Sequence, residues 1–423
     1  MQENTLILGE DQFFDLDCYK TKRNNNVLVI GASGAGKTRT VVIPNLLQAT
    51  GSYVVSDPKG SLYKEYGPYL ESKGYEVRLL NFTNPSKSIG YNFFDYIRSE
   101  NDILKIAHML VYSDGLYKKS YDPFWDQSSE LLLVAFIAYL WECRPKSEQN
   151  LSHLLTMTRA LEMNEYTGNT KSPIDRLMDE VAKRNPQSLA YKFYKAFTVG
   201  AIRTKQSVAI SIASKLQKYD IGEISNLLRH DETNLSDIGR KKTAFFVQVS
   251  DTDRSLDSLV NLFFTQAMNE LCYEADNNCE GYRLPVDVRF ILDDFATNCT
   301  IMDFPRMISS IRSRGISTML MIQAESQLEA SFGNDGQTII GNCDNVLYLG
   351  TNDIDSAESV ARRANQPIED ILYMPVETGW LFRRGEKPKK IETFKLDLHL
   401  SEWKYEKALN EGLSNENNTL VYR

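Results

Sequence analysis

The stretch NNNVLVIGASGAGKTRT, residues 24–40, decides the fold of this chain. The apolar run at 27–30 is typical of a buried strand, and it leads directly into G-x-x-x-x-G-K-T at 31–38. Glycines at these positions let backbone N–H groups turn toward a phosphate, and a helix that follows points its positive end at the same place. The stretch therefore predicts a phosphate-binding loop between a strand and a helix. The alternative is a glycine-rich turn that matches the pattern without binding anything.

Separate roles are expected for the residues of this loop. Lys37 is expected to reach the β- and γ-phosphates of ATP and to take part in catalysis, and the Thr38 hydroxyl is expected to bind Mg²⁺. The residues expected to bind the nucleotide are Gly31, Ser33, Gly34, Ala35, Gly36, Lys37, Thr38 and Arg39.

A second acidic element is predicted at FILDDFATN, residues 290–298, where an apolar strand ends in two aspartates. A hydrolase with a phosphate loop needs carboxylates there to hold the Mg²⁺ shell and to orient the attacking water. We assign Asp293 to the metal and Asp294 to the catalytic water. Glutamate is usual at the second position, and aspartate is shorter by about 1.5 Å, one C–C bond. A displacement of that size can cost about 100-fold in rate. The alternative is a purely structural role, in which the Asp-Asp pair ends a strand before a turn.

Strand-like runs recur along the chain and indicate the fold class. Several are continuously apolar, as expected for strands of a parallel sheet that is covered on both faces. They lie at 27–30, 53–56, 76–80, 243–250, 288–292, 317–323 and 345–350. We predict an α/β domain with a doubly wound, mainly parallel sheet. A hairpin at its edge is expected from 379–382 and 390–396.

The segment between the third and fourth of these strands has helical apolar spacing instead, as in NDILKIAHMLVYS (101–113) and SPIDRLMDEVAKR (172–184). We predict an all-α domain at 98–206 that interrupts a nucleotide-binding domain of 1–97 and 207–423. The longest apolar run, LLLVAFIAYLW at 131–141, is shorter than the roughly 20 residues that cross a bilayer, so a buried helix is expected there.

Composition narrows the function classes. The formal net charge of −8 argues against a surface built simply to coat nucleic acid. Three basic clusters, at 240–242, 383–384 and 389–390, are candidate DNA contacts or else ordinary solvated faces. The six cysteines form no CxxC pair and the histidines have no metal-ligand spacing, which indicates reduced thiols on a cytosolic face.

Taken together, these motifs resemble the type IV secretion coupling proteins of bacterial conjugation. The resemblance runs along nearly the whole chain, and it includes the phosphate loop, SDPKGSLYKEYGPYLESKGYEVRLLNF (56–82), YNFFDYI (91–97), DPFWDQSSELLL (122–133), the acidic strand end and TIIGNCDNVLYLGTND (338–353). It implies a RecA-like P-loop NTPase domain, similar to hexameric DNA-pumping motors, with an all-α domain inserted into it.

The resemblance also implies functional roles for individual residues. Gln323, at the end of the next strand, matches a catalytic sensor whose amide contacts the γ-phosphate and the attacking water. Arg312 matches an arginine finger supplied across a subunit boundary, although Arg314 is an alternative. The motif Asp57-Pro58-Lys59-Gly60 is expected near the nucleotide or a subunit interface, at the end of a strand beside the first one. Its alternative is a simple strand-to-helix turn.

The function that the resemblance implies is ATP hydrolysis, with Mg²⁺, that drives a DNA–relaxase or protein substrate into a type IV secretion channel during conjugation. The expected partners are single-stranded DNA with its relaxosome and the channel components. We expect a hexamer when active and a monomer in dilute solution, in the cytoplasm at the inner face of the bacterial membrane. The family usually has N-terminal transmembrane helices, which this sequence lacks, so its anchor is either removed or supplied by another subunit.

Two alternative functions remain: a nucleotide-gated docking adaptor with little turnover, and a soluble DNA-segregation or packaging translocase.

Overall fold

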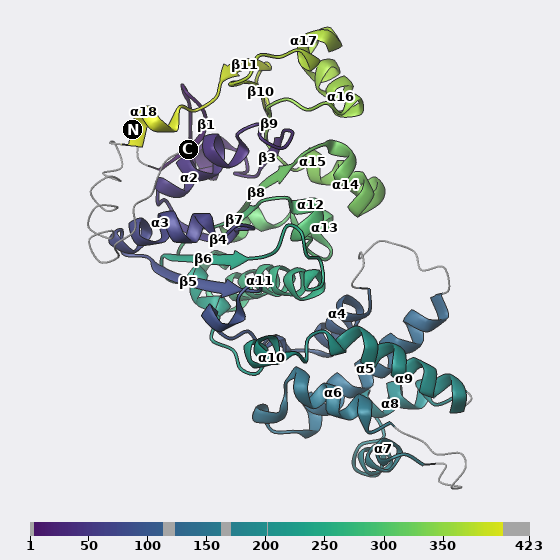
Figure 1. Cartoon of the computed structure of the whole chain (residues 1–423). Coiled ribbons are helices and arrows are strands. Elements are labelled where there is room, and N and C mark those ends of the chain that lie inside the picture. The colour runs from purple at the N-terminus through teal and green to yellow at the C-terminus, as the bar shows by residue number, and fades with distance from the viewer. Residues whose placement is uncertain (1–3, 113–122, 162–170, 201, 401–423) are drawn as a thin grey trace. The chain divides into compact units, whose positions relative to one another are not determined.

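The computed structural model of the chain describes residues 4–112, 123–161, 171–200 and 202–400 (Figure 1). The chain forms two compact units. The first contains Met1–Leu79, Asn234–Asp251 and Ala267–Arg423, and the second contains Leu80–Thr233 and Thr252–Gln266. The second unit holds the expected insertion at 98–206 but begins earlier and ends later. One reason is that Tyr91 belongs with the helices: its hydroxyl donates to Gln266 Oε1 at 2.6 Å, and its ring lies edge-on to Phe263.

A sheet of nine strands organises the first unit in the described part of the chain. Its order is β11-β10-β9-β3-β8-β7-β4-β6-β5. The strands from β9 through β3, β8, β7 and β4 to β6 pair in parallel, while β10 pairs antiparallel with both β9 and β11. The strands are β3 (Val27–Ile30), β4 (Ser52–Ser56), β5 (Glu76–Asn81), β6 (Thr243–Gln248), β7 (Val288–Leu292), β8 (Ile316–Ile322), β9 (Asn345–Tyr348), β10 (Thr378–Arg383) and β11 (Lys389–Glu392).

All seven strands and the edge hairpin expected from the sequence are present. One expectation about their neighbours was wrong: β4, the strand that ends before Asp57, does not lie beside β3. β8 and β7 stand between them, although both come much later in the chain. Hydrophobic patterning identifies a strand, but it does not specify which other strand forms its hydrogen bonds.

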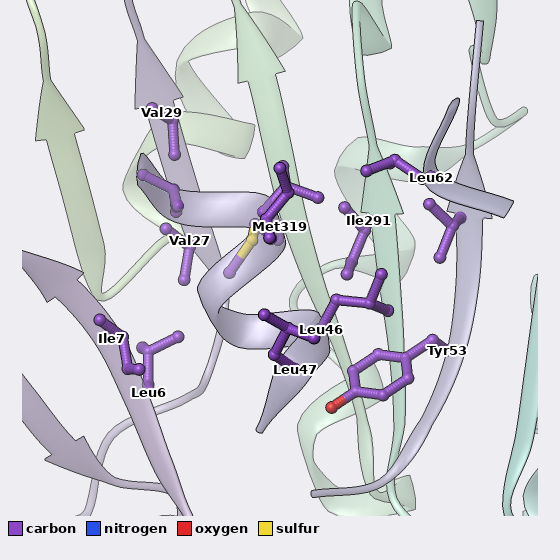
Figure 2. Packing of buried hydrophobic residues seen from close by; sticks show 14 of the residues in the cluster. Leu6, Ile7, Val27, Val29, Leu46, Leu47, Tyr53, Leu62, Ile291 and Met319 are labelled. Carbon is purple, nitrogen blue, oxygen red and sulfur yellow. The ribbon is translucent and has the colours of Figure 1, made fainter. Parts of the chain in front are cut away.

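The core of the first unit covers both faces of this sheet. Alternate strand residues such as Val27, Ile291 and Met319 pack against Leu46 and Leu47 of the helix that follows the phosphate loop (Figure 2). The residues between them, which point to the other face, are also buried. Figure 1 shows α2 and α3 on one side of the sheet and α12 to α15 on the other. This double cover explains why the strands are continuously apolar rather than alternating.

The helices of the first unit connect these strands and extend past them. They are α1 (Cys18–Thr21), α2 (Ile43–Leu47), α3 (Ser61–Ser72), α12 (Phe295–Asn298), α13 (Phe304–Met307), α14 (Glu325–Phe332), α15 (Gly336–Gly341), α16 (Ile354–Ala364), α17 (Ile368–Leu372) and α18 (Leu396–His399). A π-helical turn over Thr38–Val42 joins the phosphate loop to α2. Helix α11 (Asp257–Asn278) has its first residues in the second unit and the rest in the first.

An N-terminal hairpin of β1 (Thr5–Gly9) and β2 (Gln12–Asp15) was not expected from the sequence. Every residue of β1 is buried. The hairpin is held to the first unit by Asn45 of α2, whose side chain exchanges hydrogen bonds of 2.9 and 2.7 Å with the backbone of Ile7. A buried amide that satisfies a neighbouring strand in this way explains why β1 tolerates an edge position.

Helices make up the second unit. They are α4 (Glu100–Val111), α5 (Pro123–Cys143), α6 (Leu151–Arg159), α7 (Pro173–Arg184), α8 (Leu189–Phe197), α9 (Ile202–Gln217) and α10 (Gly222–Leu227). Ser172 and Asp175 form a capping box at the start of α7, with Pro173 at its first position. The apolar run at 131–141 lies in α5, and residues 132–140 are buried, as predicted. Among the helices that the structure describes, none has both the length and the apolarity to cross a membrane.

Candidate nucleotide-binding site

A cavity of about 420 Å³ opens where β3, β4, β6, β7 and β8 end. Carboxyl ends of parallel strands share one edge of a sheet, which is the usual place for a ligand in open α/β folds. A volume of this size lies in the range of small-molecule and cofactor sites. The cavity is lined by Ser33, Gly34, Ala35, Gly36, Lys37, Thr38, Arg39, Asp57, Pro58, Lys59, Ser61, Leu62, Asp251, Asp293, Asp294 and Gln323.

The phosphate loop has the backbone shape that its sequence predicts. Gly34 and Gly36 have φ values of 81° and 84°, a region that side chains with a Cβ rarely adopt. Within the described residues, no hydrogen bond is donated by the backbone N–H groups of Gly34, Gly36 or Lys37. Unsatisfied donors at the start of a helical segment fit an anion, so the loop suits a nucleotide phosphate.

Lys37 points back over the loop. Its Nζ donates to the carbonyl oxygens of Gly31 at 2.6 Å and Ala32 at 3.2 Å. Burial lowers the pKa of the ammonium group, while the carboxylates of Asp293 and Asp294 raise it. The side chain is only 8% exposed. A buried ammonium group that donates only to neutral carbonyls can exchange them for phosphate oxygens, which are charged and therefore stronger acceptors.

Asp293 and Thr38, the two residues expected to bind the metal, lie next to each other. The Thr38 hydroxyl donates to Asp293 Oδ2 at 3.4 Å, so a carboxylate and a hydroxyl oxygen meet at the end of the phosphate loop. Burial, followed by the neighbouring Asp294 carboxylate, raises the pKa of Asp293. One carboxylate and one hydroxyl fit Mg²⁺, which usually takes few protein ligands and completes its shell with water and substrate phosphates. A bound cation would offset both causes of the raised pKa.

Asp293→Asn is predicted to raise the thermal stability of the nucleotide-free protein by about 2 °C and to abolish Mg²⁺-dependent nucleotide binding. Because the folded-state pKa is raised, the folded protein binds this proton more tightly than the unfolded chain. Stability is therefore lost as the pH rises from the unfolded value to the folded one, and the ionised carboxylate is destabilising at neutral pH. Thermal melts with and without Mg²⁺ and ADP measure both effects. A lower melting temperature without nucleotide, or unchanged stabilisation by Mg²⁺ and ADP, would contradict the assignment.

Asp294 and Gln323 meet across the ends of β7 and β8. Gln323 Nε2 donates to Asp294 Oδ1 at 3.4 Å, and the Gln323 backbone N–H donates to Gln327 Oε1 at 2.8 Å. Asp294 has left-handed backbone angles, φ 50° and ψ 44°. Aspartate adopts this conformation more readily than most residues other than glycine, and here it turns the chain sharply at the end of β7. The structure thus brings the expected water-orienting carboxylate and the expected sensor amide together.

The expected arginine finger lies elsewhere. Arg312 precedes β8 and Gln323 follows it, and a strand of seven residues at about 3.3 Å each separates its ends by roughly 23 Å. Arg312 Nη2 donates to the Cys18 carbonyl at 2.6 Å. Arg314 makes two hydrogen bonds of 2.7 Å to the Asp276 carboxylate. Neither arginine reaches the nucleotide cavity of its own chain, and Arg314 is already engaged by a carboxylate.

Arg39 lines the mouth of the cavity and forms an ion pair with Asp397 of α18. Both side chains are mostly exposed, so the pair contributes little to stability.

The motif at 57–60 lines the cavity, as the resemblance implied, and it also begins α3. Asp57 is buried, and its Oδ2 accepts a hydrogen bond of 2.9 Å from the Tyr63 backbone N–H. Burial raises the pKa of Asp57, although N–H groups at the start of α3 lower it. Lys59 is exposed at the cavity. The turn is therefore structural at Asp57, whereas Lys59 is exposed to solvent at the edge of the cavity.

Gly60→Ala is predicted to destabilise the protein by roughly 1–2 kcal/mol for the left-handed backbone, plus about 1 kcal/mol for crowding. Gly60 has φ 66°, and an added Cβ would lie 2.7–2.8 Å from the Gln248 side chain. Gly74, with φ 82° and nothing within 4 Å of an added Cβ, is the matched control for the backbone cost alone. Denaturant unfolding of the two alanine variants measures the difference. Equal losses of stability would show that Gln248 moves aside freely.

Asp251 is a cavity residue that was not singled out from the sequence. It follows β6 closely, as Asp293 follows β7. Its position just after a predicted apolar strand could have indicated it, because residues that follow the strands of a parallel sheet meet at one edge of that sheet.

The basic clusters considered as DNA contacts are largely paired with carboxylates. Arg240 bonds to Glu274 at 2.6 Å, Lys241 bonds to Glu76 at 2.7 Å, and Arg384 bonds to Asp344 at 2.8 Å. Paired charges contribute less to phosphate binding than free ones, so these clusters are weaker DNA candidates than the sequence alone indicated.

Comparison with known proteins places this site in context. The profile of a family described as type IV secretory system conjugative DNA transfer matches residues 3–364. A search of curated proteins found no match.

Solved structures share the fold over nearly the whole chain. The unbound bacterial conjugative coupling protein TrwBdeltaN70 is 15% identical, with a TM-score of 0.66, and the match covers 93% of this chain and 89% of that one. TrwB with the ATP analogue ADPNP is 14% identical, with a TM-score of 0.67 and coverage of 93% and 90%. VirB4 of Thermoanaerobacter pseudethanolicus is 13% identical, with a TM-score of 0.56 and coverage of 93% and 97%. At these identities the likeness shows the fold alone, and it confirms the RecA-like P-loop NTPase architecture expected from the sequence.

Proposed function

Because this chain belongs to the type IV secretory system conjugative DNA transfer family, we propose that it is an ATP-hydrolysing coupling protein that receives a DNA–relaxase complex and drives it toward a secretion channel. The observation that carries the proposal is one cavity lined by Lys37, Thr38, Asp293, Asp294 and Gln323. These are the side chains that phosphate binding, metal binding and activation of water require. TrwB has been solved with ADPNP and with ADP and Mg²⁺, which supports ATP and Mg²⁺ as the ligands here.

In this proposal each side chain has one task. The loop N–H groups and Lys37 bind the β- and γ-phosphates, and Thr38 and Asp293 hold Mg²⁺, which would neutralise charge on the phosphate oxygens. Asp294 orients the attacking water, and Gln323 donates from its amide to the same region. Arg312 acts on the nucleotide of a neighbouring subunit, because its own cavity is out of reach. The active form is then a ring, which we take to be a hexamer that forms on DNA from monomers.

The partners and place in the cell follow from the family. We propose that single-stranded DNA with its relaxosome is the cargo and that channel components receive it at the inner face of the bacterial membrane. The helical unit has no nucleotide motif and is the proposed surface for cargo proteins.

ATP turnover with and without single-stranded DNA tests this proposal against a docking adaptor that binds ATP but hardly hydrolyses it. The motor predicts turnover that rises when DNA is added and that Lys37→Ala removes. No turnover above the Lys37→Ala background, including in rings enforced by fusion to a hexameric carrier, would exclude the motor. Nucleotide binding with an intact cavity but no turnover would then favour the adaptor.

Asp294→Asn is predicted to lower turnover by about 100-fold, the lower end of the range for a general acid or base, without weakening ATP binding. The change removes a negative charge but keeps the size of the side chain. Asp294→Glu is the matched control, since it keeps the charge, extends the reach by about 1.5 Å and is expected to match or exceed the wild-type rate. Steady-state turnover and ADP affinity should be measured for both. A wild-type rate for Asp294→Asn would remove Asp294 from the reaction.

A further inference from the structure

A second cavity, of about 290 Å³, lies in the first unit at the amino-terminal ends of β4, β7 and β8. The nucleotide cavity lies at the carboxyl ends of these strands, so the two are separate sites on opposite edges of the sheet. The lining of the second cavity mixes three arginines with two tyrosine rings and several hydroxyl and amide groups.

Arg289 is the unusual member of this lining. It is the second residue of β7, and its side chain is only 7% exposed. Its Nε lies 3.4 Å from Ser317 Oγ, and none of the described carboxylates forms an ion pair with it. Burial lowers the pKa of this guanidinium group. The neighbouring Asp287 carboxylate favours the charged form of Arg289 but forms no ion pair with it, so the buried charge is only partly balanced, which favours an anion that enters the cavity.

The other two arginines differ in how their charge is balanced. Arg283 forms hydrogen bonds of 2.6 and 2.8 Å to the Asp287 carboxylate and lies over the Tyr19 ring. Arg312 donates to the Cys18 carbonyl and forms no ion pair with a described carboxylate. The remaining acid, Asp17, accepts backbone hydrogen bonds at the start of α1. Among the described residues, neither Arg289 nor Arg312 forms an ion pair, although the Asp287 carboxylate lies near enough to act on the charge of Arg289.

We propose that this cavity binds a small phosphate-bearing molecule, with Arg289 as its principal contact and Arg312 as a second. A phosphate monoester carries a charge of about −1.5 to −2 at neutral pH, which matches two guanidinium groups. The planar fork of arginine also fits phosphate oxygens in pairs. A volume of 290 Å³ equals roughly ten waters at about 30 Å³ each, so there is room for an organic group beyond the phosphate. The rings of Tyr19 and Tyr53 offer apolar surface for it.

This proposal requires neither ATP turnover nor ring assembly, and it shares only Arg312 with the function proposed above, so its test is carried by Arg289 in the isolated chain. The test is calorimetric titration with AMP and with inorganic phosphate, at low ionic strength in chloride. The proteins are the wild type, Lys37→Ala, Arg289→Gln, and Lys37→Ala combined with Arg289→Gln, Arg289→Lys or Arg312→Gln. The wild type is expected to show two sites. Lys37→Ala and Arg289→Gln are each expected to show one, and the variant that combines these two no site of comparable affinity. Within the Lys37→Ala background, Arg289→Gln should weaken binding at least tenfold, and Arg289→Lys should weaken it less because charge is kept while the fork is lost.

Arg312→Gln, also made in the Lys37→Ala background, tests the second proposed contact. Arg312 is more exposed than Arg289, so its loss should weaken binding several-fold without affecting folding. Thermal melts establish that each variant is folded. Tighter binding of AMP than of phosphate identifies a phosphorylated organic ligand, and equal binding identifies phosphate itself; both support the site. Absence of saturable binding by Lys37→Ala protein, or equal affinity with and without Arg289 and Arg312, would overturn it.

Discussion

Lys37→Ala will lower ATP turnover by at least about 1,000-fold and will weaken Mg²⁺-nucleotide binding. The Lys37 ammonium group is buried in the phosphate loop, with Nζ 2.6 Å from the Gly31 carbonyl, so it is fixed where the phosphates would lie. Alanine removes this charge and leaves the loop without a cation inside it. Burial lowers the pKa of Lys37, which means that the charged side chain is itself destabilising in the nucleotide-free fold. Loss of activity is therefore expected without loss of thermal stability.

Lys59→Ala is the matched control for this variant. Lys59 lines the same cavity but is exposed, so its charge is screened by water. We expect turnover within about threefold of wild type, since exposed charges contribute little. Turnover and fluorescent-ADP affinity should be measured for both variants beside thermal melts. Turnover by Lys37→Ala close to the wild-type value would mean that the phosphate loop is not where ATP is hydrolysed.

Arg312→Ala will lower DNA-stimulated turnover by about 1,000-fold or more, the effect of an arginine finger, while leaving the affinity of the nucleotide cavity for Mg²⁺ and ADP unchanged in the isolated chain. The seven-residue strand between Arg312 and Gln323 keeps this guanidinium group out of its own site. It can stabilise phosphoryl charge only in a neighbouring subunit. Arg314→Ala is the comparison: because Arg314 is held by two bonds to Asp276, its loss should lower thermal stability more than turnover.

Mixed rings test whether the two residues act from different subunits. Lys37→Ala and Arg312→Ala protein should each be inactive, but a mixture should regain part of the turnover. Some interfaces in a mixed ring combine an intact Lys37 from one subunit with an intact Arg312 from the next. Absence of recovery in rings shown to contain both variants, or wild-type turnover by Arg312→Ala alone, would contradict the assignment.

Most of the fold followed from local sequence patterns, because strands covered on both faces leave continuous apolar runs. The run at 288–292 is an example: it was predicted as a strand and is buried throughout. The order of strands did not follow, since β4 pairs with β6 and β7 rather than with β3. That choice depends on contacts between segments far apart in the chain, which periodicity does not encode. The hairpin of β1 and β2 was missed because its burial depends on a distant side chain, Asn45.

The residues of the candidate sites also fall into those that local motifs indicate and those that only the fold brings together. The phosphate loop and Asp293 could be proposed from the sequence because they lie in contiguous motifs, and the structure places both at one cavity. Gln323 required the resemblance to a family, as a single amide at a strand end has no pattern of its own. Asp251 and the buried Arg289 were not singled out, because only the arrangement of the sheet brings them to cavities. The sequence offered two arginines for the finger, and the bonds between Arg314 and Asp276 favour Arg312.

The most direct test of the proposed motor is displacement of streptavidin from the biotinylated end of a single-stranded DNA by rings assembled on it. The account predicts displacement with ATP and Mg²⁺, none with a non-hydrolysable analogue, and none by Lys37→Ala rings that bind the same DNA. If wild-type rings bind the DNA and ATP but displace no streptavidin and hydrolyse no ATP, the protein is a docking adaptor and the account is wrong.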